Sequence, residues 1–190
     1  VKPVNVDDVP ILTLTLACGP SGEDQGLEIL PTAPSAKVGE QIVIQAEPLE
    51  ALATDLTWEV REPHGGGFLR SQGFTITYVA PASAGTYTLV AHARRADGSR
   101  FRATFPVQVR PDPSVEPAMI ALAPGDTQVF AARMKGLPRS TVTWSVEEPE
   151  GGEISPEGLY RAPRRSGTYH VIATSTVDAA VSATATVKVE

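Results

Sequence analysis

Apolar and polar residues alternate over short stretches along most of the chain, and Gly, Pro and Asp separate these stretches. Examples are QIVIQAEP at 41–48, GTYTLVAHA at 85–93 and VSATATVKV at 181–189. A period of two is typical of strands that bury one face, and no helical stretch lies between them. The pattern therefore predicts an all-β fold, with antiparallel sheets packed as sandwiches.

One strand-rich unit occurs twice in the sequence. LTWEVREPHGG at 56–66 matches VTWSVEEPEGG at 142–152 with an offset of 86 residues. YVAPASAGTYTLVAHA at 78–93 matches YRAPRRSGTYHVIATS at 160–175 with an offset of 82. Several matching blocks in the same order indicate an internal duplication.

The duplication predicts how the chain is divided. We expect residues 27–110 and 117–190 to form two β-sandwich domains, preceded by an N-terminal extension at 1–26. The segment VRPDPSVEP at 109–117 contains three prolines. We therefore expect residues 111–116 to form a short, stiff and extended linker.

Two aromatic pairs occupy equivalent places in the copies. Trp58 and Trp144 each alternate with apolar neighbours, so we expect both in the core between the sheets rather than on a sugar-binding platform. Tyr87 and Tyr169 follow the turn into a long strand, and we expect their hydroxyl groups to anchor that corner. We assign all four residues to the structural core.

These motifs resemble those of bacterial immunoglobulin-like domains, which occur in tandem on surface proteins. The resemblance rests on KVGEQIVIQA and APGDTQVFAA, on the Thr-Trp motif and on the Gly-Thr-Tyr motif. It is closest in GLYRAPRRSGTYHVIATS at 158–175, and the first copy departs from it where GFTITYVAP at 73–81 replaces the shorter GLYRAP. The resemblance implies two tandem immunoglobulin-like sandwiches. It implies no catalytic residues, because such modules serve as stalks, adhesin segments, enzyme accessories and filament subunits.

Composition narrows the functional classes. The net charge is −6 and both signs are scattered, which disfavours nucleic acid as a partner. No run approaches the roughly 18 apolar residues of a membrane helix. A single Asn, two Met and 17 Pro fit a protein from a hot environment, and a GC-rich genome would give a similar bias.

No group of residues in the sequence suggests catalysis or a cofactor. We expect no shared metal site among the histidines, because they lie at non-equivalent positions of the two copies: His64, His92 and His170. The acidic pair Glu147–Glu148 is interpreted as a solvated surface. We therefore expect a protein that is not an enzyme and holds no metal or cofactor.

The most apolar segment lies ahead of the repeats. In ILTLTLA at 11–17, one face carries the three leucines and the other carries the remaining residues: Leu12, Leu14 and Leu16 against Ile11, Thr13, Thr15 and Ala17. Such alternation predicts a strand. Burial of three leucines would contribute roughly 5–8 kcal/mol before ordering costs, whereas exposure would promote aggregation. We expect a flexible hinge to follow it.

The destination of this strand decides between functional hypotheses. It can pack on its own first domain, or it can join a sheet of a neighbouring molecule by strand addition. The second case gives head-to-tail polymers. Our leading hypothesis is the subunit of a pilus-like extracellular bacterial filament that is a homopolymer assembled by donor strand exchange, although each module already has a full strand set.

Two alternatives remain open. Because Cys18 is the only cysteine, the chain has no internal disulfide. Its thiol could carry a lipid anchor or form an intermolecular disulfide. The chain would then be a surface-anchored lipoprotein or adhesin stalk. The third hypothesis is an accessory carbohydrate-binding or spacer part of an enzyme. In the first two cases we expect an extracellular or cell-surface protein, with copies of itself as the main partner and cell-surface or glycan ligands as further partners.

Overall fold

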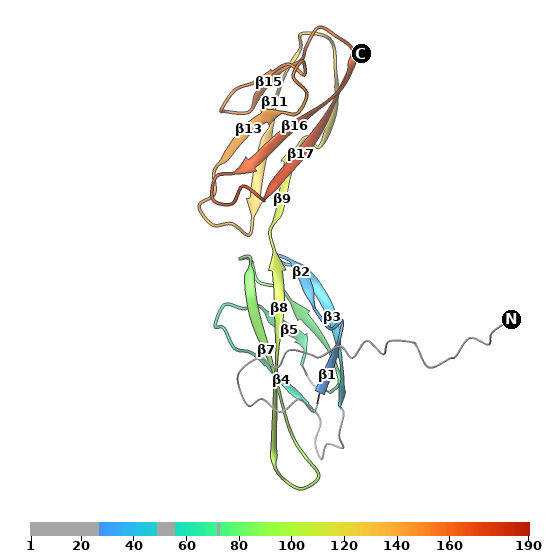
Figure 1. Ribbon diagram of the computed structural model, residues 1–190, viewed down its shortest axis with the longest axis vertical. Coiled ribbons are helices and arrows are strands. Elements are labelled where there is room, and N and C mark those ends of the chain that lie inside the picture. The colour runs from blue at the N-terminus through green and yellow to red at the C-terminus, as the bar shows by residue number, and fades with distance from the viewer. Residues whose placement is uncertain (1–26, 49–55, 72) are drawn as a thin grey trace, which may run out of the picture.

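The computed structural model describes residues 27–48, 56–71 and 73–190, and in this part of the chain strands are the only regular secondary structure. They form two β-sandwiches that follow one another along the long axis of the molecule (Figure 1). The predicted all-β fold with two tandem sandwiches is therefore confirmed. The proposed intersubunit strand at 11–17 and Cys18 lie outside the described residues.

The first sandwich, domain 1, consists of β1 to β8. One sheet has the order β1-β3-β6-β5, from Leu27–Leu30, Gln41–Pro48, Thr75–Val79 and Gly67–Arg70. The other has the order β2-β8-β7-β4, from Ser35–Lys37, Arg100–Arg110, Gly85–Arg94 and Thr57–Val60. The strands pair antiparallel, except that β2 runs parallel to β8. The chain thus changes sheets between β1 and β2, as in immunoglobulin-like domains.

The second sandwich, domain 2, consists of β9 to β17 and repeats this plan. One sheet has the order β10-β17-β16-β13, from Met119–Leu122, Ser182–Val189, Gly167–Ser175 and Val142–Val146. Opposite lie β11-β15-β14, from Thr127–Val129, Leu159–Arg161 and Glu153–Ile154, and the pair β12-β9, from Ala131–Lys135 and Asp112–Glu116. Strand β10 runs parallel to β17, as β2 does to β8.

The segment expected as a linker at 111–116 differs from that expectation. Residues 112–116 form β9, which pairs with β12 from Asp112↔Lys135 to Glu116↔Ala131. Only Pro111 stands between the end of β8 and the start of β9. A proline-containing strand is compatible with this position because β9 is paired on one side in its sheet, and an edge strand does not need every N–H group.

Each sandwich has its own apolar core. In domain 1 the largest fully buried aliphatic side chains are Ile44, Leu56, Ile76 and Leu89. In domain 2 three aromatic rings meet in the core: the Phe130 ring centroid lies 6.0 Å from that of Tyr160 and 6.4 Å from that of Trp144. Rings at such distances and tilts contribute beyond the area that they bury.

A buried tyrosine at an equivalent position ties each core to a loop. The hydroxyl of Tyr78 donates to the carbonyl of Gly65 at 2.5 Å, and that of Tyr160 donates to the carbonyl of Gly151 at 2.6 Å. Burial, assisted by nearby tyrosine and glutamate side chains, raises the pKa of each hydroxyl to about 12. Both side chains therefore stay neutral as donors up to strongly alkaline pH.

We expect each domain to lose stability as the pH rises from about 10 to about 12. In that interval the unfolded chain loses the tyrosine proton while the folded domain keeps it. The free energy of unfolding should then fall by up to roughly 1.4 kcal/mol per pH unit for each domain, while below about pH 10 the contribution is fully present. Urea unfolding at several pH values measures the slope. Tyr160→Phe should flatten it in domain 2 alone, and an unchanged slope there would contradict the assignment.

Candidate functional site

The two tryptophans of the repeat lie at the cores. Trp58 on β4 is 7% exposed, and its indole N–H donates to the carbonyl of Gly73 at 3.2 Å. Trp144 on β13 is half-buried and packs against the core of domain 2. These positions give the two rings a packing role.

The tyrosines of the Gly-Thr-Tyr motif both make a local contact at the corner before a long strand. The Tyr87 hydroxyl donates to the carbonyl of Ser83 at 3.0 Å, and the Tyr169 hydroxyl donates to the carbonyl of Arg165 at 2.9 Å. In both cases the acceptor lies four residues earlier. The two corners are therefore built alike, ahead of β7 and β16.

A hydrogen bond and close packing connect the two domains in addition to the covalent chain. The N–H of Ala84 in domain 1 donates to the carbonyl of Gly136 in domain 2 at 2.9 Å. A Cβ atom at Gly136 would lie 2.8 Å from Val38 Cγ1 and 3.2 Å from Pro111 Cα. The loop after β12 therefore packs closely on domain 1 and on the connecting residue.

An ion pair adds a second contact across the junction. Lys37 Nζ lies 2.9 Å from Asp112 Oδ1, and the side chains are 61% and 36% exposed. Their mutual hydrogen bond and attraction raise the pKa of Lys37 and lower that of Asp112. Solvent screens such a pair, so it adds little stability, and it is a second point of contact between the domains.

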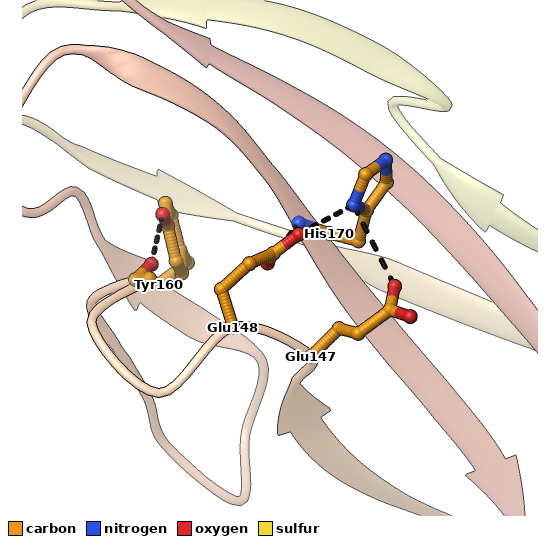
Figure 2. A network of polar contacts seen from close by, with 5 residues as sticks. Glu147, Glu148, Tyr160 and His170 are labelled. Atoms are coloured by element: carbon orange, nitrogen blue, oxygen red, sulfur yellow. Dashed lines mark hydrogen bonds and ion pairs between the residues drawn. The ribbon is translucent and has the colours of Figure 1, made fainter.

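A polar network on domain 2 combines three ionisable side chains (Figure 2). Glu148 Oε1 lies 2.7 Å from His170 Nδ1, and Glu147 Oε2 lies 3.6 Å from the same nitrogen. Glu148 Oε2 also accepts the backbone N–H of His170 at 2.9 Å. Burial acts to raise the pKa of Glu148, but the hydrogen bonds from His170 together outweigh it and hold the pKa below its usual value.

Strand pairing explains why these residues meet. Val146 at the end of β13 lies opposite Val171 on β16, and the next residue, Glu147, donates its N–H to the carbonyl of His170 at 3.0 Å. From the sequence pattern alone, the Glu147–Glu148 pair is interpreted as a solvated surface. The histidines are considered only as possible metal ligands together with one another. The sequence pattern misses this cluster, which an alignment of the two strands as an antiparallel pair would reveal.

Domain 1 contains the same backbone frame with other side chains. Glu62 Oε2 accepts the backbone N–H of Thr88 at 2.8 Å, and the N–H of Arg61 donates to the carbonyl of Thr88 at 2.9 Å. The glutamate that binds the neighbouring strand is thus a feature of both domains. The imidazole and the second carboxylate are specific to domain 2.

One negative result concerns membranes. Across residues 27–48, 56–71 and 73–190 there is no helix long and apolar enough to span a bilayer.

Comparisons with known proteins identify no family for this chain. No protein-family profile and no curated protein matches it. Among solved structures, the insect immune protein hemolin is 16% identical over 83% of this chain and 44% of its own, with a TM-score of 0.45. A C-terminal fragment of intimin is 13% identical over 85% of this chain and 62% of its own, with a TM-score of 0.43. The fibronectin(III)-like modules of Clostridium thermocellum CbhA are 17% identical over 86% and 94%, with a TM-score of 0.29.

This chain spans less than half of hemolin and less than two thirds of the intimin fragment. Identities and TM-scores this low carry no inference about this chain, so its architecture is described from its own strands. The strand orders in the two sandwiches, with their parallel pairs β2–β8 and β10–β17, describe that architecture directly. The chain consists of two tandem immunoglobulin-like β-sandwich domains.

Proposed function

We propose that this chain is a non-enzymatic structural rod outside the cell, in which two immunoglobulin-like domains hold a nearly fixed relative orientation. The observation that carries the proposal is the junction: β8 passes into β9 through Pro111 alone, and the loop at Gly136 packs on Val38. A long strand continued by a proline has little freedom to bend. Such a rod would act as a stalk or spacer for whatever lies at its ends.

The exterior of the cell is the natural setting for this architecture. Sandwiches of this type are common building blocks of cell-surface proteins. The net charge of −6 also favours solubility of an extended molecule. Anchoring through Cys18 fits the stalk hypothesis, and mass spectrometry of the native protein would detect an acyl group on that residue.

Assembly into filaments by strand donation is the second candidate. The alternating segment at 11–17 supplies a strand-like sequence, and β4 stands at the border of its sheet in domain 1. Both sandwiches already contain strands on each side of the core, so a donated strand would extend an edge rather than fill a gap. Deletion of 1–17 should abolish polymers seen by electron microscopy, and polymers that persist would rule out this strand as the joint.

Distance measurements between the domains test the rod directly. With Cys18→Ser as background, spin labels at Val43 and Val177, which are 61% and 62% exposed, should give one narrow distance distribution. Lys37→Glu should broaden it, because the ion pair with Asp112 becomes a repulsion. Insertion of Gly-Ser-Gly-Ser after Pro111 should broaden it further.

The matched control changes the same charge away from the junction. Lys188→Glu alters an ion pair with Glu190 inside domain 2 and should leave the distribution narrow. A native distribution as wide as that of the insertion variant would show that the domains move independently, and the rod proposal would then be wrong.

A further inference from the structure

We propose that Glu147, Glu148 and His170 form a binding site for one divalent transition-metal cation, for which Zn²⁺ has the best-fitting chemistry. The proposal concerns a ligand site on domain 2. It is independent of whether the chain acts as a stalk or as a filament subunit.

The spacing of the donor atoms fits a metal coordination sphere. One ligand atom from each residue lies within 4.8 Å of the other two. A tetrahedral zinc ion with bonds of about 2.0–2.1 Å places its ligands about 3.4 Å apart. His170 Nδ1 lies 2.7 Å from Glu148 Oε1 and 3.6 Å from Glu147 Oε2, and both distances are within about 0.7 Å of that spacing.

The types of donor favour a transition metal over calcium or magnesium. Calcium takes six to eight oxygen ligands, and magnesium keeps an octahedron of oxygens. Imidazole nitrogen suits zinc and other transition metals, and carboxylate oxygens are also zinc ligands, so these three groups with one water would complete a four-coordinate zinc sphere. The Glu148 carboxylate is oriented in advance, because its second oxygen accepts the backbone N–H of His170 at 2.9 Å.

The charges at equivalent positions of the two domains also support a cation site in domain 2. Where domain 2 has Glu147, domain 1 has Arg61, so the residue before the strand-binding glutamate carries a positive charge there. In domain 2 that fixed positive charge is replaced by a second carboxylate, and both carboxylates approach one imidazole nitrogen (Figure 2). That nitrogen carries at most one proton, which only one carboxylate can accept well. A cation among the three groups would neutralise both carboxylates.

Binding requires a simple exchange at His170. The lone pair on Nδ1 coordinates the metal, so any proton on Nδ1 leaves to solvent or moves to Nε2. The hydrogen bond between Nδ1 and Glu148 Oε1 is replaced by two bonds to the metal. Affinity should therefore fall at acidic pH, where protons compete for the imidazole and the carboxylates.

Calorimetric titration with Zn²⁺ tests the proposal in the 190-residue chain carrying Cys18→Ser, which removes the thiol as a ligand. We expect one site per chain at neutral pH. His170→Thr and Glu147→Arg, which install the domain 1 residues Thr88 and Arg61, should each weaken binding at least about tenfold. His92→Thr is the matched control: His92 Nε2 lies 3.1 Å from Glu59 Oε1, a histidine–carboxylate pair outside the three-residue cluster.

A second readout separates metal binding from folding. Zn²⁺ should raise the unfolding temperature of domain 2 and leave that of domain 1 unchanged, because only the folded site binds. Glu147→Gln keeps the test valid if His170→Thr folds poorly, since the Glu147 side chain is 62% exposed. Absence of binding by the parent chain, equal binding by His170→Thr, or an equal loss in His92→Thr would overturn the proposal, and the rod function would be unaffected.

Discussion

Replacement of Phe130 by alanine is expected to destabilise domain 2 by about 3–5 kcal/mol and to leave domain 1 unchanged. Phe130 is 2% exposed and stands between β11 and β12, in contact with Tyr160 and Trp144. Truncation removes both ring contacts and leaves a cavity that strands on two sheets cannot close without breaking their pairing. Because domains of this size have a total stability of about 5–15 kcal/mol, the loss would be a large fraction.

The effect can be measured one domain at a time. The chain has two tryptophans, one in each domain, so Trp58→Phe leaves Trp144 as the fluorescent reporter of domain 2 during urea unfolding. Val129→Ala is the matched control, since Val129 precedes Phe130 and is 60% exposed; it should change stability by less than about 0.5 kcal/mol. A loss below about 1 kcal/mol in Phe130→Ala would mean that the aromatic cluster is not the centre of this core.

Replacement of Gly152 by alanine is expected to destabilise domain 2 by more than about 3 kcal/mol. A Cβ atom there would lie 2.3 Å from the carbonyl oxygen of Arg161, and the residue has a φ of +94°. Gly66 in domain 1 has the same φ, and its Cβ would lie 2.2 Å from the carbonyl oxygen of Val79. Backbone atoms cannot move aside as a flexible side chain would, so the loop must shift away from the strand.

A second glycine separates backbone strain from steric overlap. Gly125 has a φ of +86°, and a Cβ atom there would have no other atom within 4 Å, so Gly125→Ala should cost only about 1–2 kcal/mol. Thermal or urea unfolding of both variants gives the difference. Equal losses would show that overlap with the Arg161 carbonyl contributes nothing, contrary to the expectation.

The duplication makes each domain a reference for the other. Positions at which both copies agree, such as the tyrosine corner and the glutamate that binds the neighbouring strand, serve the fold. Positions at which they differ are where specific properties arise. By this comparison Glu148 has a structural role shared with Glu62, whereas the imidazole of His170 has no counterpart at Thr88, the equivalent position of domain 1.

Several features of this protein were predictable because they are local. Alternation predicted the strands, and two copies of the Thr-Trp and Gly-Thr-Tyr motifs predicted two sandwiches of one type. The positions of Trp58 and Trp144 were predictable for the same reason, since an apolar ring flanked by alternating apolar residues must face a core. None of this required knowledge of which strands lie side by side.

The proline-rich segment and the polar cluster show the limit of such reasoning. The prolines led to the prediction of a linker where the structure has β9. A strand that is paired on one side can contain prolines and still pair with β12. Glu147 and His170 are separated by 23 positions in the sequence, and only the register of β13 with β16 brings them together.

The sequence by itself determined the strand content, the duplication and the residues that must be buried, because each follows from the side chains of neighbouring positions. Only the tertiary structure decided the one-residue junction and the meeting of two carboxylates with one imidazole. Both depend on hydrogen bonds between strands far apart in the chain, and the side-chain pattern of a single strand does not specify its partner or its register.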